Sequence, residues 1–276
     1  MNALEIHGLT KRRGDFVLRG LELTLPAGCI MGLIGENGAG KSTTIRLILN
    51  GLRRDGGTIA VYGKDNRAMT ALDREDIGVV LDEVGLPEYM TARQIGRMMA
   101  GIFTRWQPEV YRGYLRRLAL PEDKPFRDFS RGMKMKQGLA VALSHQPKLL
   151  LLDEATSGLD PVVRDEILTI FADFTRDEEH AVLLSSHIVS DLEKICDYIA
   201  FLHKGRLLLC EEKDRLTEEY GILRGGAEDI DPAAVCGRHT TPYGTEYLVR
   251  RDAVPVGMAL GQVNIEDLFV FMAKEV

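Results

Sequence analysis

The stretch Gly35-Glu36-Asn37-Gly38-Ala39-Gly40-Lys41-Ser42 decides the fold of this chain. It fits the pattern G-x-x-x-x-G-K-[ST], in which a glycine-rich turn directs backbone N–H groups, and the next helix its positive end, toward phosphate groups. An apolar run at 29–34 precedes the turn as a predicted strand, and 41–50 follows it as a predicted helix. Lys41 can reach the terminal phosphates, and the hydroxyl of Ser42 suits Mg²⁺, a hard cation that prefers oxygen ligands. We therefore assign residues 35–43, ending with Thr43, to the phosphates of a nucleotide.

The sequence on both sides of this turn alternates between strand-like and helical segments. Ile95, Met99, Ile102, Phe103 and Trp106 recur at steps of three and four residues, which is typical of a helical block. The alternation predicts an α/β fold with a mainly parallel sheet, an antiparallel β subdomain at the N-terminus and an inserted α-helical subdomain. Strands are predicted at 4–9, 16–25, 57–62, 77–81, 149–152 and 181–185, and helices at 91–143, from 161, after 187 and at 264–274.

The pattern weakens past about residue 209. Residues 1–210 are predicted to form a P-loop NTPase core, with the helical subdomain at about 84–144. Residues 211–276 are predicted to form a small C-terminal extension, with a helix at 211–220 and a strand at 245–250. The sequence assigns no role to this extension.

The overall composition excludes several classes of protein. The 35 basic and 41 acidic residues give a net charge of −6, which argues against binding of nucleic acid through the overall field of the chain. The four cysteines are widely spaced and form no CxxC pair, so we interpret them as reduced thiols. No apolar stretch approaches the roughly 18 residues that span a bilayer, and the N-terminus has no secretion signal. We therefore expect a cytoplasmic protein; if it acts at a membrane, another chain must do the crossing.

A second stretch, Leu149-Leu150-Leu151-Leu152-Asp153-Glu154, ends a continuous apolar strand with two carboxylates. Adjacent residues on a strand point to opposite faces, so the two carboxylates can serve different purposes. We assign Asp153 to Mg²⁺, directly or through water, and Glu154 to the water that attacks the phosphate. The alternative, from these residues alone, is a pair of solvated acids at the end of a strand.

Three short motifs accompany this pair: Phe129-Ser130-Arg131-Gly132-Met133, Ala155-Thr156-Ser157-Gly158-Leu159-Asp160 and Ser185-Ser186-His187. With them, residues from about 3 to 209 resemble the ATP-binding cassette family. The resemblance implies that two chains sandwich two ATP molecules, with Ser130 and Gly132 of one chain at the γ-phosphate bound by the other. It also implies that Asp160 links the two sites, and that His187 contacts the γ-phosphate and orients the catalytic water. Without the resemblance, Ser130 and Asp160 are plain helix caps and His187 is a buried, hydrogen-bonded histidine.

The chain departs from the family pattern around the expected nucleotide. Where the family has an aromatic residue that stacks on adenine, this chain has Arg13, with Phe16 nearby, and either side chain can stack on a base. Where the family has glutamine, this chain has Asp82, which can still bind Mg²⁺ but adds negative charge beside the triphosphate. The alternative for Asp82 is an acid turned to solvent. Arg131 stands where the signature motif commonly has glycine, and we expect it to face water rather than the partner's ATP.

The resemblance implies a function as well as a fold. We expect the ATP-binding subunit of a transporter, using ATP and Mg²⁺, paired with a second copy or a close paralogue and with a separate membrane permease. We expect the chain to lie at the cytoplasmic face of the membrane. Its docking surface for the permease is expected near 86–95 and includes Tyr89 and Met90. The single cassette with a short C-terminal extension favours an exporter. The alternatives are a soluble cassette ATPase acting on ribosomes or DNA and, less in keeping with the signature motif, a small-molecule kinase or GTPase.

Overall fold

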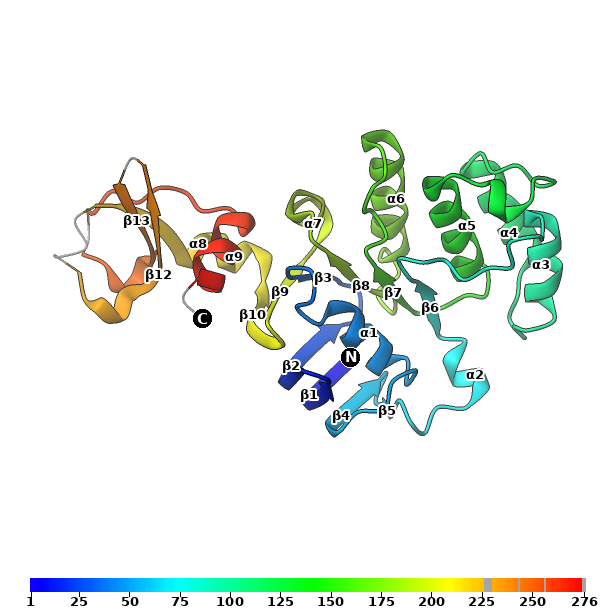
Figure 1. Cartoon of the computed structure of the whole chain (residues 1–276), viewed down its shortest axis with the longest axis horizontal. Coiled ribbons are helices and arrows are strands. Elements are labelled where there is room, and N and C mark those ends of the chain that lie inside the picture. The colour runs from blue at the N-terminus through cyan, green and yellow to red at the C-terminus, as the bar shows by residue number, and fades with distance from the viewer. Residues whose placement is uncertain (226–229, 243, 256, 275–276) are drawn as a thin grey trace.

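The computed structural model describes residues 1–225, 230–242, 244–255 and 257–274 and has three parts (Figure 1). A core that contains the N-terminus lies in the middle of the view. A group of helices lies on its right, and a smaller unit formed by the C-terminal residues lies on its left. The two outer parts therefore contact opposite sides of the core.

The core is built on a six-stranded sheet with the order β10-β9-β3-β8-β7-β6. Neighbouring strands from β9 to β6 pair in parallel, and only β10 pairs antiparallel, with β9. This confirms the predicted α/β fold with a mainly parallel sheet. Strands β9 and β10 extend this sheet beyond the strands predicted from the sequence. The strand bounds are β3 Ile30–Ile34, β6 Ile77–Val80, β7 Leu149–Asp153, β8 Ala181–Ser186, β9 Tyr198–His203 and β10 Arg206–Glu212.

Strand β7 explains why its sequence is apolar at every position. Leu149 and Leu151 pack with helix α1 (Lys41–Ile48) and the N-terminal sheet, whereas Leu150 and Leu152 pack with the helices of the opposite face. Those helices are α5 (Arg131–Leu143), α6 (Pro161–Phe174) and α7 (Val189–Ile195). Each buried leucine contributes about 1.5–3 kcal/mol relative to an exposed one, so burial on both faces holds this strand firmly in the sheet. The strand thus presents Asp153 at a fixed point of its carboxyl end.

An antiparallel sheet, as predicted, covers one face of the core. Its order is β2-β1-β4-β5, and β1 and β2 form a hairpin in which Arg13 faces Phe16 across the turn at residues 14–15. The hairpin therefore holds the two candidate base-stacking residues side by side. The element bounds are β1 Asn2–Arg13, β2 Phe16–Pro26, β4 Gly56–Val61, β5 Lys64–Asp65 and, after them, α2 Ala71–Arg74.

The helical part is less continuous than its periodicity predicts. Helix α3 (Ala92–Ala100) ends at Gly101, and α4 (Pro108–Arg117) begins with a proline, which favours the first turn of a helix and disfavours the interior. Ile102, Phe103 and Trp106 therefore lie in a connecting segment, so the predicted helical periodicity beyond Met99 was wrong. A 3₁₀ turn at Phe126–Asp128 leads into α5.

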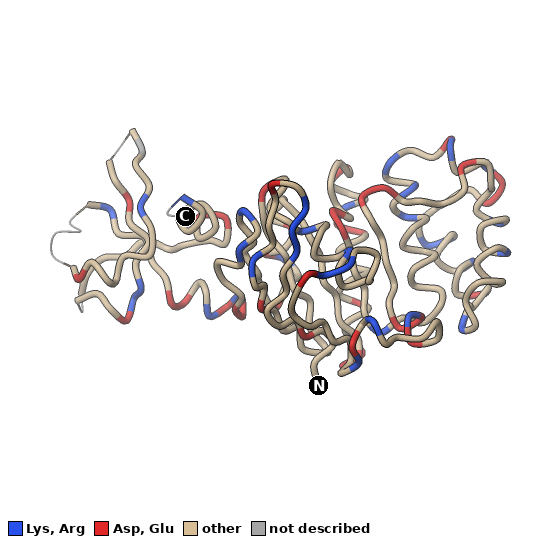
Figure 2. Tube along the Cα trace, turned by 60° about the horizontal axis from the view of Figure 1, so that its bottom comes forward, with Lys and Arg blue, Asp and Glu red and all other residues tan. Residues whose placement is uncertain are grey.

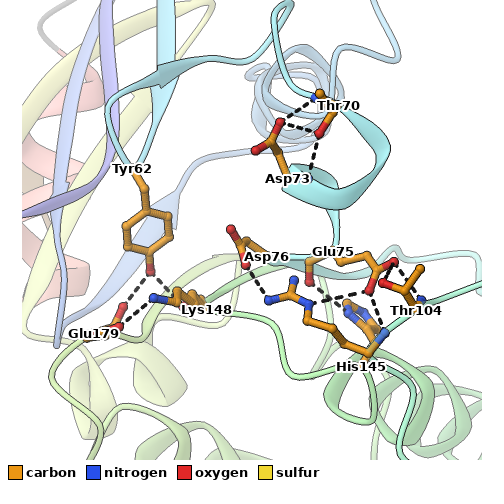
Figure 3. A network of polar contacts seen from close by, with 10 residues as sticks. Tyr62, Thr70, Asp73, Glu75, Asp76, Thr104, His145, Lys148 and Glu179 are labelled. Carbon is orange, nitrogen blue, oxygen red and sulfur yellow. Dashed lines mark hydrogen bonds and ion pairs between the residues drawn. The ribbon is translucent and has the colours of Figure 1, made fainter.

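A buried carboxylate fixes the base of the helical part to the core (Figure 3). Glu75 precedes β6 and accepts hydrogen bonds from Thr104 N and Thr104 Oγ1, both 2.8 Å, and from Arg105 N, 2.9 Å. Burial alone would raise the pKa of Glu75, but these hydrogen bonds and the Arg105 charge lower the pKa to about 2. Arg105 also donates to Asp76 at 2.8 Å, and the Glu75 carbonyl lies 3.0 Å from His145 Nδ1. This junction therefore combines several hydrogen bonds around a carboxylate that is largely shielded from solvent.

The C-terminal residues form more regular structure than the sequence predicts. Three strands pair in the order β11-β13-β12, and of these only β13 was predicted. The last helix packs against the core: the rings of Phe269 and Phe201 lie 5.4 Å apart, and Ile265 N donates to Glu193 Oε1 at 2.8 Å. The boundary predicted at 210 falls within β10. The bounds are α8 Lys213–Glu219, β11 Tyr220–Arg224, β12 Val235–Thr241, β13 Gly244–Arg250 and α9 Ile265–Lys274, with 3₁₀ turns at Pro232–Ala234 and Arg251–Ala253.

Both signs of charge occur in all three parts of the chain (Figure 2). Within the described residues, no helix combines the length and the apolar character that crossing a bilayer requires.

Candidate active site

The phosphate-binding loop joins β3 to α1 at the centre of the core. Gly40 directly precedes α1 with a φ of 115°, and a Cβ atom there would lie 2.7 Å from Cζ of Phe16. A Cβ atom on Gly35 would lie 2.4 Å from the carbonyl oxygen of Leu202. Only glycine fits at these two positions, because a side chain would meet a neighbouring strand or the aromatic ring. The loop therefore has the backbone shape that its sequence predicts.

A cavity of about 340 Å³ opens beside this loop. Both Arg13 and Phe16 line it, so the structure places both candidate base-stacking residues at the same site. The volume falls within the range of about 300–1,000 Å³ that is typical of small-molecule sites. The residues that line it are Arg13, Phe16, Glu36, Asn37, Gly38, Gly40, Lys41, Ser42, Thr43, Asp82 and Glu154.

A connected set of charged groups lies at the end of this cavity. Lys41 Nζ donates to the carbonyl oxygen of Gly35 at 2.6 Å and lies 3.1 Å from Oε1 of Glu154. The other oxygen of Glu154 lies 2.7 Å from Nδ1 of His187. The Lys41 and Glu154 side chains are only 5% and 13% exposed, so their charges are little screened by solvent. The structure thus brings together the lysine, the carboxylate and the histidine that the sequence places far apart.

Asp153 and Glu154 are adjacent in sequence but differ in backbone conformation. Asp153 ends β7, whereas Glu154 has a φ of 53° and lies outside the strand. The prediction that the two alternate along one strand was therefore wrong, and the backbone turn sends Glu154 toward Lys41 instead.

Ser185 holds this carboxylate pair in place, a contact that sequence reasoning missed. Its hydroxyl donates to Asp153 Oδ1 at 2.6 Å, and its carbonyl oxygen accepts from the backbone N of Glu154 at 3.1 Å. The parallel register places Ser185 opposite Asp153 on the neighbouring strand. A predicted pairing of β7 with β8 would have been the signal needed to find this contact.

The donor atoms at this site suit Mg²⁺ that arrives with a nucleotide. Ser42 and Asp82 line the cavity, and Asp153 lies at the carboxyl end of β7 next to Glu154. The site therefore offers both hydroxyl and carboxylate oxygens as ligands. Among the described residues, no group of three or more His, Cys, Asp and Glu side chains is placed to hold a metal ion. Mg²⁺ is usually bound through one or two carboxylates together with substrate phosphates, which fits this donor set.

Asp82 and Arg131, two of the departures from the family pattern, contact each other. Arg131 Nη2 donates to Asp82 Oδ1 at 2.7 Å, and the two side chains are 54% and 52% exposed. The prediction that Arg131 faces water is therefore only partly correct, because its guanidinium group is half exposed but forms an ion pair.

Ser130, Gly132 and Asp160 are not among the described residues that line the cavity. Ser130 caps α5 by accepting from Met133 N at 3.3 Å. Asp160 caps α6 by accepting from Val162 N and Val163 N at 3.2 and 3.0 Å. Within one chain Ser130 and Asp160 therefore act as helix caps, and Gly132 lies in the first turn of α5.

The chain is similar to several known proteins. Residues 18–157 match the family model described as ABC transporter. The bacitracin transport ATP-binding protein BcrA of Enterococcus faecalis is 30% identical over 272 residues, covering 95% of this chain and 87% of the relative. The Nod factor export ATP-binding protein I of Rhizobium sp. (strain N33) is 36% identical over 225 residues, covering 79% and 73%. A solved ATP-binding subunit of an ABC transporter has a TM-score of 0.72 at 27% identity, covering 78% of this chain and 92% of that structure.

Proposed function

Since the chain belongs to the ABC transporter family and is an ATP-binding subunit with ATPase activity, we propose that two copies clamp ATP between them and drive export through a separate membrane permease. The observation that carries the proposal is the linked set Lys41, Glu154 and His187 at the end of the phosphate-loop cavity. A general base and a cation that binds the phosphates are groups that hydrolysis of a phosphoanhydride uses, and here the histidine contacts the base.

Each residue of the site has a distinct part in this proposal. The loop N–H groups, the positive end of α1 and Lys41 bind the phosphates. Mg²⁺, when bound, offsets the phosphate charge, and Ser42, Asp82 and Asp153 are the residues that would hold it. Glu154 accepts a proton from the attacking water, while His187 holds the carboxylate in place through its 2.7 Å contact and can reach toward the terminal phosphate. Arg13 and Phe16 offer two surfaces for the base.

The proposal needs a second copy because two of the expected site residues do not line the cavity of their own chain. Ser130 and Gly132 lie at the N-terminal end of α5, where the positive end of the helix dipole would favour a phosphate. We propose that they meet the γ-phosphate held by the partner chain, and that Asp160 lies at the contact between the two sites. The solved structures include a dimeric ATP-binding cassette with ADP and Pi, whose likeness at 18% identity speaks for the fold alone.

We propose a second cavity, of about 740 Å³, as the docking site for the permease. It lies between the loop at 82–88 and α5, directly beside Asp82, where an inserted segment of a partner would sense the nucleotide site. Nearby, Tyr89 is 78% exposed, and the Arg127 guanidinium lies 5.1 Å from the centre of the Tyr89 ring. Met90 is half buried, which makes Tyr89 the better candidate of the two predicted contact residues. On this proposal the chain works at the cytoplasmic face of the membrane.

The substitution Glu154→Gln tests the catalytic part of the proposal. We expect hydrolysis to fall by about 10²- to 10⁴-fold, because an amide cannot accept the proton of water. ATP binding should persist, and a closed dimer should accumulate in size-exclusion chromatography with ATP. Glu218→Gln, at an exposed position of α8, serves as the matched control and should retain full activity. Near-normal turnover in the Glu154 variant would remove this residue from its assigned role.

Co-purification tests the transport part. The chain should associate with a polytopic membrane protein encoded beside it when the two are expressed together, and Tyr89→Ala should weaken that association while leaving hydrolysis by the isolated subunit intact. Association with ribosomes or DNA instead would favour the soluble cassette ATPase.

A further inference from the structure

Arg131 connects three segments around the nucleotide cavity. It is the first residue of α5, and its guanidinium donates to Asp82 in the loop after β6 at 2.7 Å. The same guanidinium lies against Gly158, in the loop that follows Glu154, where a Cβ atom would be 3.3 Å from Nη1. Gly158 has a φ of 69°, so glycine there permits both the turn and the close approach of Arg131. Movement of this one side chain therefore affects the helical part, the β6 loop and the loop after the catalytic carboxylate.

Asp82 lies on the border between two cavities. It lines the 340 Å³ nucleotide cavity together with Lys41 and Ser42, and it also lines the 740 Å³ cavity beside α5. Of these two cavities, Arg131 lines the second. Asp82 therefore borders the nucleotide cavity while its carboxylate contacts the Arg131 guanidinium.

We propose that Arg131 is a positioning residue that competes with the Mg²⁺–nucleotide for the carboxylate of Asp82. This inference rests on the proposed function, since it requires Mg²⁺–nucleotide in the cavity. A carboxylate oxygen that accepts from a guanidinium group cannot at the same time serve freely as a ligand of Mg²⁺, which demands close and nearly ideal octahedral geometry. The two cations also repel each other at short range. Binding of Mg²⁺–nucleotide would therefore draw Asp82 away from Arg131 and remove this ion pair between the β6 loop and the N-terminal end of α5.

The strength of the ion pair suits such an exchange. Both side chains are about half exposed, and exposed ion pairs typically change an equilibrium by no more than about fivefold. A restraint of this size delays the engagement of Mg²⁺ without blocking it. The opposite possibility is that Arg131 helps binding by offsetting the negative charge of Asp82, and it predicts an effect of the opposite sign.

A double-mutant cycle on the full-length chain distinguishes these possibilities. AMPPNP, which is not hydrolysed, is titrated by calorimetry at a series of Mg²⁺ concentrations, so the readout is binding rather than activity. The variants are Arg131→Met, Asp82→Asn and the combination of the two, with Arg131→Lys as the conservative replacement. Arg97→Met is the matched control, since it removes an exposed arginine of α3 that lines neither cavity.

We expect Arg131→Met to lower the Mg²⁺ concentration needed for half-maximal binding by about two- to fivefold, while Arg131→Lys stays near the unsubstituted value. In the Asp82→Asn background, Arg131→Met should have no effect, because the contested carboxylate is gone. An unchanged or raised Mg²⁺ requirement in Arg131→Met, the same shift in the Asp82→Asn background, or an equal shift in Arg97→Met would each overturn the inference while leaving the proposed function standing. Failure of the unsubstituted chain to bind AMPPNP with Mg²⁺ would overturn both.

Discussion

Two of the polar junctions between the helical part and the core differ in construction. At the base, Glu75 is 6% exposed and accepts three hydrogen bonds from Thr104 and Arg105. At the edge next to the nucleotide cavity, Asp82 and Arg131 form a single half-exposed ion pair. The first junction is buried and has several hydrogen bonds, whereas the second is half exposed and has one ion pair.

This difference indicates which end of the helical part can move. Regions that open at low cost have few buried contacts and many solvent-exposed polar ones. On the inference above, the base at Glu75 would act as the fixed end, and the N-terminal end of α5 would be the end that responds to the nucleotide. Motion about such a fixed base would carry Ser130 and Gly132 toward or away from a second chain.

The largest effect on stability is expected at the base. Glu75→Ala should lower the free energy of unfolding by about 3 kcal/mol, because it leaves two backbone N–H groups without their acceptor and removes the ion pair with Arg105. Urea denaturation followed by circular dichroism measures this change. Thr104→Val removes only one hydroxyl hydrogen bond and should cost about 1 kcal/mol. Equal and small losses in both variants would show that the base is not the fixed end.

The same junction should depend on pH in a defined window. The pKa of Glu75 is lowered in the folded chain from 4.5 to about 2. A carboxylate whose pKa is lowered by folding contributes stability above its unfolded pKa, and the contribution is lost as the carboxylate is protonated. The stability difference between the unsubstituted chain and Glu75→Gln should therefore be constant above about pH 4.5 and shrink as the pH falls toward about 2. A difference that grows on acidification would contradict the junction as described.

The smallest effect on stability is expected at the exposed edge. Arg131→Met should change the free energy of unfolding by about 0–1 kcal/mol, because an ion pair of this exposure is screened by solvent. Its effect should appear instead in the Mg²⁺ dependence of nucleotide binding. A loss as large as that of Glu75→Ala, measured in the same urea titrations, would make the two junctions equivalent and remove the contrast between them.

The fold could be predicted where local sequence determines it. The glycines at 35–40 dictate a turn that few other residues allow, and the run at 149–152 has the apolar continuity of a strand covered on both faces. Strand β12 of the C-terminal unit was not predicted, because its short, mixed sequence gains its structure from packing on α9. Gly237 of this strand, for example, lies against Phe271 of α9.

The candidate site could be predicted in its residues but not in its contacts. Lys41, Glu154 and His187 were all assigned from motifs, yet their direct linkage depends on the left-handed backbone at Glu154. The contact of Asp82 with Arg131 joins residues 49 positions apart. Each residue departs from the family pattern in a different motif, so the sequence gives no sign that the two touch. Such pairs arise from the tertiary arrangement of loops, which spacing along the chain does not encode.

The most direct test of the shared site mixes two inactive variants. Lys41→Ala disables the phosphate loop of its own chain, and Ser130→Ala disables the residue that a chain is proposed to supply to its partner. Neither variant alone should hydrolyse ATP appreciably, but a mixed dimer contains one intact site, made of the loop from one chain and Ser130 from the other. With equal amounts of the two variants, we predict recovery of about a quarter of the unsubstituted activity, since about half of the dimers are mixed and each has one of two sites intact. Activity no greater than the sum of the separate variants would contradict a site built from two copies of this chain.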